Sequence, residues 1–80
     1  MPRTYTRLDP KIGKVIAKNT RKLRIEGGLS QAALERKSGI NQSALCHLEK
    51  GRVVNPSLSM ILRVSKALKV TPSQLTGLQL

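Results

Sequence analysis

The side chains with the most specific hydrogen-bonding chemistry lie close together near the middle of the chain. Gln42 carries a donor and an acceptor on one amide, Ser43 has a hydroxyl, and His47 has two ring nitrogens. An amide can pair with N6 and N7 of adenine together, a hydroxyl can donate or accept, and the Ala44 methyl can meet a thymine methyl. These groups could therefore pair with the edges of nucleic-acid bases, and an ordinary solvated helix surface is the alternative.

The charge balance also favours a polyanionic partner. Lys and Arg number 15 against 4 Asp and Glu, for a net charge of +11, and residues 1–26 are the most basic part. Such a chain indicates nucleic acid first and an anionic membrane surface second. No window approaches the ~18 apolar residues of a membrane span, and the first residues do not resemble a signal peptide. A single cysteine suits a reducing compartment. We therefore expect a small cytoplasmic protein without membrane attachment.

The same inventory argues against catalysis. The four carboxylates are scattered, so no paired acid and base is indicated. Cys46 and His47 are adjacent on one expected helix, so their side chains point about 100° apart. One Cys and one His also fall short of the four ligands of a structural zinc site. We expect no catalytic residues, no metal and no cofactor.

Helical periodicity runs through the whole chain, beginning with a first helix that ends at Gly27 and Gly28. Its apolar stripe comprises Ile12, Val15, Ile16, Thr20 and Leu23. Residues 1–10 are expected to form a basic flexible arm, and residues 11–80 the folded domain. Arg3 and Arg7 on that arm could follow the duplex or enter a minor groove, or remain solvated.

Two short helices with a tight connection follow. Ser30 is an expected N-cap for a helix through Lys37 that stops at Gly39. Asn41 caps a third helix, about residues 42–50, in which Leu45 and Leu48 must face the core. This face turns Gln42, Ser43, Cys46 and His47 outward. The pattern is typical of a helix-turn-helix.

Two further helices complete an all-α domain. Asn55-Pro56-Ser57 predicts the opening of a fourth helix with proline in its first turn. Its expected inward face comprises Leu58, Ile61, Leu62, Ser65 and Leu68. Thr71-Pro72-Ser73-Gln74 has the pattern of a capping box that opens a short fifth helix.

Motifs in order along the chain resemble the Cro/cI-type (XRE) helix-turn-helix family, over about residues 12–78. They are Leu23-Arg24, Gly28-Leu29-Ser30-Gln31, Leu34, Ser38-Gly39-Ile40, Leu45, Leu48-Glu49-Lys50-Gly51, Asn55-Pro56-Ser57-Leu58 and Lys66-Ala67-Leu68. The resemblance implies a compact five-helix lambda repressor-like domain. In one departure, Lys69 stands where a helix-ending glycine is usual.

The resemblance also implies roles for individual residues. Base reading falls on Gln42, Ser43 and His47, although His47 could equally bond a phosphate or only water. A buried ion pair joins Arg24 to Glu49. Gln31 matches a phosphate-contacting glutamine, and Ser30 begins the same helix, whose N–H groups would face a phosphate strand. The expected phosphate-binding residues are Ser30, Gln31, Lys50, Arg52 and Asn55.

The function expected from these features is a sequence-specific transcriptional regulator of double-stranded DNA, such as a repressor or a phage-type or restriction–modification controller. An antitoxin-type protein-binding module that autoregulates its operon is one alternative. An RNA-binding or nonspecific nucleic-acid-binding protein is another, disfavoured by the lack of stacking aromatics. One recognition helix covers few base pairs, so a homodimer on a two-half-site operator is expected. Its interface is assigned to Leu75, Leu78 and Leu80.

Overall fold

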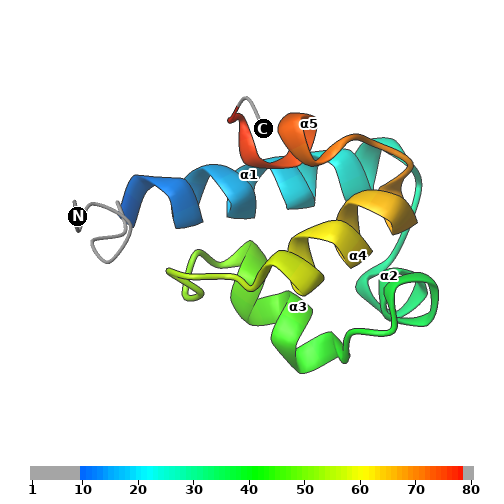
Figure 1. The fold of residues 1–80 in the computed structure, drawn as a ribbon. Coiled ribbons are helices and arrows are strands. Elements are labelled where there is room, and N and C mark those ends of the chain that lie inside the picture. Colours follow the sequence, from blue (N-terminus) through cyan, green and yellow to red (C-terminus); the bar gives the residue numbers. More distant parts are fainter. Residues whose placement is uncertain (1–9, 79–80) are drawn as a thin grey trace.

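The computed structural model describes residues 10–78, and within them the chain folds into five α-helices without a strand (Figure 1). The expected all-α class is confirmed. The helices are α1 (Pro10–Glu26), α2 (Gln31–Ser38), α3 (Gln42–Glu49), α4 (Leu58–Leu68) and α5 (Pro72–Thr76).

Local capping interactions define most helix starts, as the sequence predicts. The Ser30 side chain accepts a hydrogen bond from the Ala33 backbone N–H at 3.0 Å, and Asn41 caps α3 in the same way. Thr71 and Gln74 form a reciprocal capping box at α5. Because these bonds satisfy N–H groups that lack partners inside the helix, each start is set by a few neighbouring residues.

Two helix starts differ from the prediction. Ser57 is the N-cap of α4 and accepts from the Met60 N–H, so Pro56 precedes the cap and does not occupy the first turn. A serine hydroxyl can satisfy an N–H group, which a proline ring cannot do, and this decides the start. Helix α1 begins at Pro10, which was assigned to the arm. The remaining arm, with Arg3 and Arg7, lies outside the described residues.

The core is aliphatic and draws on every helix. Its buried cluster comprises Ile16, Leu34, Leu45, Leu48, Val64 and Leu75. Helix α1 packs against α3 and α5, while α2 packs against α3 and α4. Helix α3 is therefore held on two sides, which fixes the direction of its outward face (Figure 1).

Helix α4 is rotated relative to the predicted face. Leu58 and Leu62 were expected inside but are 65% and 47% exposed, whereas Val64 is fully buried beside Ser65. Val15 of α1 is likewise exposed rather than part of the buried stripe. The apolar residues of α4 allow two overlapping stripes, and the neighbouring α2 and α5 select the one containing Val64.

Two residues occupy positions with unusual backbone requirements, one for its conformation and one for its lack of a side chain. Lys69 ends α4 in the left-handed conformation at φ 60°, the conformation that favours glycine. Gly13 lies buried in α1, where a Cβ atom would approach the carbonyl oxygen of Val53 to 2.9 Å. The close approach lets α1 contact the loop between α3 and α4.

Among the described helices, none has the length and apolar character to span a membrane.

Candidate nucleic-acid interface

Helix α3 presents a polar face because its leucines are anchored on the other side. Leu45 and Leu48 are buried in the core, and Gln42, Ser43 and His47 are exposed. The half-buried residues Ala44 and Cys46 lie between these two faces. The base-reading candidates therefore lie on the accessible side of α3.

A shallow hollow of about 410 Å³ joins α3 to its neighbours. Its lining residues come from α2, α3 and the following loop, and comprise Gln31, Gln42, Ser43, Cys46, His47, Lys50 and Arg52. Base-reading and phosphate-binding candidates thus share one surface. Ser30 and Asn55 are exposed but do not line this hollow. Cys46 was not assigned to the site by sequence, although its outward direction was predicted.

His47 and Arg52 contact each other across this surface. Nη1 of Arg52 lies 3.5 Å from Nδ1 of His47. A guanidinium can only donate, so a hydrogen bond at this contact uses Nδ1 of His47 as the acceptor. Sequence alone did not indicate this pairing.

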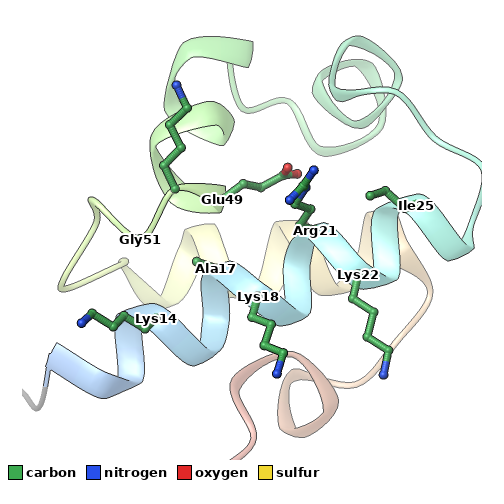
Figure 2. Close-up of a pocket in the computed structure, with 9 residues that line it drawn as sticks. Lys14, Ala17, Lys18, Arg21, Lys22, Ile25, Glu49 and Gly51 are labelled. Atoms are coloured by element: carbon green, nitrogen blue, oxygen red, sulfur yellow. The ribbon is translucent and has the colours of Figure 1, made fainter.

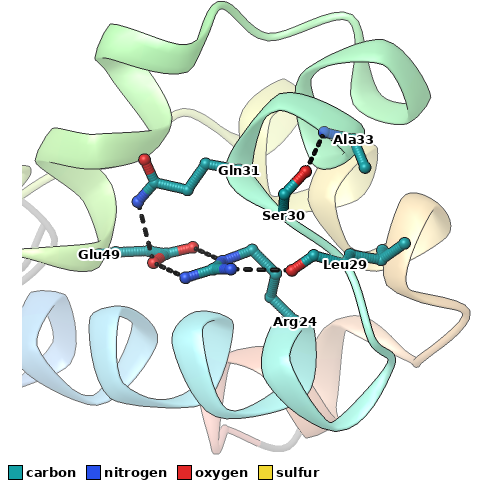
Figure 3. A network of polar contacts seen from close by, with 6 residues as sticks. All are labelled: Arg24, Leu29, Ser30, Gln31, Ala33 and Glu49. Atoms are coloured by element: carbon teal, nitrogen blue, oxygen red, sulfur yellow. Dashed lines mark hydrogen bonds and ion pairs between the residues drawn. The ribbon is translucent and has the colours of Figure 1, made fainter.

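Arg24 of α1 and Glu49 of α3 form a bidentate ion pair (Figure 3). The Arg24 Nε donates to Glu49 Oε2 at 2.7 Å and Nη2 donates to Oε1 at 3.0 Å, while Nη1 donates to the Leu29 carbonyl at 2.8 Å. The side chains are only 13% and 3% exposed. The hydrogen bonds to Glu49 raise the pKa of Arg24 above its usual value, because they favour the charged guanidinium.

Gln31 belongs to the same network. Its Nε2 donates to Glu49 Oε1 at 3.2 Å, so the first residue of α2 is tied to the last residue of α3 (Figure 3). This bond uses one of the two amide N–H groups and fixes the orientation of the side chain. The sequence indicated Gln31 and the ion pair separately but gave no signal that they touch.

The dimer interface expected from the sequence is only partly accessible in the structure. Leu75 is fully buried in the core, so the prediction that it lies in a dimer interface is wrong. The small domain needs this side chain to close α5 over α1. Leu78 is 42% exposed, and Leu80 lies outside the described residues.

Comparison with known protein families identifies the family of this chain. The helix-turn-helix family model HTH_3 matches residues 21–75, which include the whole of α2 and α3. The chain belongs to this helix-turn-helix family. The resemblance to Cro/cI-type DNA-binding regulators is thereby confirmed, and the helix-turn-helix protein is a transcriptional regulator of this type.

Similar proteins agree with this family. A relative described as an uncharacterized HTH-type transcriptional regulator, y4dJ of Sinorhizobium fredii, is 37% identical over 62 residues, covering 78% of this chain and 79% of the relative. The restriction–modification controller protein C.AhdI of Aeromonas hydrophila has a TM-score of 0.74 and 35% identity, covering 79% of this chain and 94% of its own. The hypothetical transcription factor NHTF of Neisseria has a TM-score of 0.76 and 32% identity, with coverages of 95% and 85%.

Proposed function

We propose that this helix-turn-helix protein binds a specific double-stranded operator by inserting α3 into the major groove. The observation that carries the proposal is the hollow that brings Gln42, Ser43 and His47 together with Gln31 and Arg52. A major groove about 12 Å wide accepts one helix, whose N-terminal side chains reach the bases. Gln42 and Ser43 are the first residues of α3 and are exposed. Ala44 supplies a partly accessible methyl group for a thymine.

Two clamps would hold the phosphate backbone on either side of α3. At the start of α2, Ser30 and Gln31 accompany backbone N–H groups that favour an anion. After α3, Lys50, Arg52 and Asn55 form the second clamp, and each is exposed. These contacts fix the register of α3, while the base contacts supply specificity.

The proposed operator contains two half-sites that bind a homodimer. Paired domains of this kind read half-sites about 34 Å apart. Leu78 and Val15 are exposed apolar residues, and Val15 lies beside Gly77, since a Cβ on Gly77 would lie 3.3 Å from Val15 Cγ1. This patch, together with Leu80, is the proposed contact between protomers. The likeness to a restriction–modification controller supports a regulator of that kind, acting as a repressor or controller in the cytoplasm.

Selection of bound duplexes from a random pool tests this function. We expect the selected duplexes to share one preferred site. The logarithm of the binding constant should fall linearly with the logarithm of the salt concentration, with a slope of about −0.9 for each phosphate that the protein neutralises. On that site, Gln42→Ala should cost about 1–3 kcal/mol at one base pair and relax the preference there. The measurement is a binding titration on the selected duplex and on each single-base variant.

Arg52→Ala is the matched comparison, because it removes a phosphate contact from the same hollow. It should weaken binding to all duplexes by a similar factor and reduce the salt slope by about 0.9. Equal losses on selected and random duplexes for Gln42→Ala would contradict base reading by α3. Failure to enrich any sequence would contradict specific binding altogether.

A further inference from the structure

A second basic groove lies beside the proposed interface, between α1 and the end of α3. It has a volume of about 640 Å³. Its lining residues are Lys14, Ala17, Lys18, Arg21, Lys22, Ile25, Glu49, Lys50 and Gly51 (Figure 2). Five of these side chains are cationic, and the single acid, Glu49, is already paired with Arg24.

The cations on α1 are available to an external anion. No hydrogen bond or ion pair within residues 10–78 holds the side chains of Lys14, Lys18, Arg21 or Lys22. Lys14, Lys18 and Lys22 recur every four residues, roughly 6 Å along the helix axis. In Figure 2, Lys18 and Lys22 project outward from α1 next to each other. An extended polyanion running along α1 would therefore meet a cation at each turn.

The groove is continuous with the surface that faces the operator. Lys50 lines both this groove and the hollow at α3. A strand held by the clamp after α3 can pass Lys50 and continue over α1, and Glu49, the one acid that lines the groove, is already paired with Arg24. The residues that line the groove disfavour the docking of a helix from another protein, because such a helix would need several apolar contacts. Ala17 and Gly51 are small and nearly in contact, which leaves Ile25 as the one large apolar side chain in the lining.

We propose that this α1 groove binds the phosphates of DNA that flanks the operator, and so lengthens the footprint of each protomer beyond the base pairs read by α3. The proposal rests on operator binding through α3 but assigns a separate set of residues. The contacts are made to phosphates and carry no base preference. Their contribution is affinity that depends on duplex length and on salt.

The test uses the full chain and two duplexes that share the selected operator. One ends at the outer edge of the half-sites, and the other continues for several base pairs of arbitrary sequence on each side. We expect the wild-type protein to bind the longer duplex several-fold more tightly. Lys18→Gln/Lys22→Gln should lose most of this gain, and its salt slope on the longer duplex should fall by about 0.9 per cation removed.

Lys37→Gln/Lys66→Gln removes the same charge from a different surface and is the matched control. It should keep the gain from the longer duplex, and both variants should melt like the wild type. An unchanged gain and an unchanged salt slope for Lys18→Gln/Lys22→Gln would overturn the proposal, and would be the outcome if the groove served an acidic protein instead. Selectivity between operator and random duplexes reports separately on the function of α3.

Discussion

At the residue scale, the ion pair of Arg24 and Glu49 links the structure to the interface. Its bidentate geometry holds the end of α3 against α1, and Gln31 joins the start of α2 to the same carboxylate. A nearly buried charge is tolerated only when its hydrogen bonds are made. Three helices are therefore fixed by one carboxylate directly behind the proposed phosphate contact.

Removing Glu49 should destabilise the whole domain. Glu49→Ala leaves the Arg24 guanidinium without its partner in a largely buried position, so the free energy of unfolding should fall by about 3 kcal/mol. Urea unfolding followed by circular dichroism measures this loss. The same variant should weaken operator binding, because Gln31 also loses the bond that orients it.

Two comparisons separate the buried pair from simple loss of a negative charge. Glu26→Ala removes an exposed acid from the end of α1 and should change stability by less than about 0.5 kcal/mol. Arg24→Met/Glu49→Leu replaces the pair with apolar side chains and should recover most of the stability. Equal unfolding curves for Glu49→Ala and Glu26→Ala would contradict the structural role of the pair.

At the element scale, the contact of α1 with the loop after α3 positions the second phosphate clamp. Gly13 permits this contact, because its missing side chain leaves room for the Val53 carbonyl. Arg52 and Asn55 lie on the same loop, one and two residues from Val53. The spacing of two elements thus depends on one glycine within a helix.

Gly13→Ala should destabilise the domain although alanine favours helix formation. An isolated helix would gain about 1 kcal/mol from this change, whereas a Cβ only 2.9 Å from backbone oxygen forces α1 and the loop apart, at a cost of about 1–3 kcal/mol. Thermal unfolding gives the sign directly. Lys14→Ala, at the next and exposed position, is the control and should be nearly neutral. A stabilised Gly13→Ala variant would contradict the close packing.

At the scale of the whole molecule, the strong positive charge supports the proposed mode of DNA binding. The net charge of +11 attracts DNA of any sequence, so charge contributes affinity without selecting a sequence. The proposed selection of one operator needs more base pairs than one α3 can read, which is why we propose a second protomer. The exposed patch of Val15 and Leu78 is small, so pairing is expected to be favoured mainly on DNA.

Truncation after Gly77 tests this pairing. Helix α5 ends at Thr76 and its Gly77 cap is retained, so the truncated protein should keep its fold and nearly its melting temperature. Cooperative binding to an operator with two half-sites should disappear, a loss of about tenfold in affinity, while binding to one half-site should not change. Titration of both duplexes measures the difference. Unchanged cooperativity would place the interface elsewhere or exclude it.

The helices and much of the proposed recognition face could be predicted from the sequence alone. Ser30, Asn41 and the Thr71–Gln74 capping box set helix starts through bonds within three residues, so local rules were sufficient. Leu45 and Leu48 indicated the buried side of α3, and the exposed position of Ser43, on the opposite side of the helix, follows from their spacing. The start of α4 was less well predicted, because both Pro56 and Ser57 are compatible with a helix terminus.

Which of several competing contacts are made depends on how the helices pack against one another. Leu58 and Val64 both lie on plausible apolar stripes, and the packing of α4 against α2 and α5 buries the second. Leu75 is likewise in the core because α5 packs against α1 and α4. The bond from Gln31 to Glu49 and the groove along α1 join residues far apart in the chain. Periodicity specifies which side chains share a face of a helix, whereas the partner of that face depends on how all five helices fill one small volume.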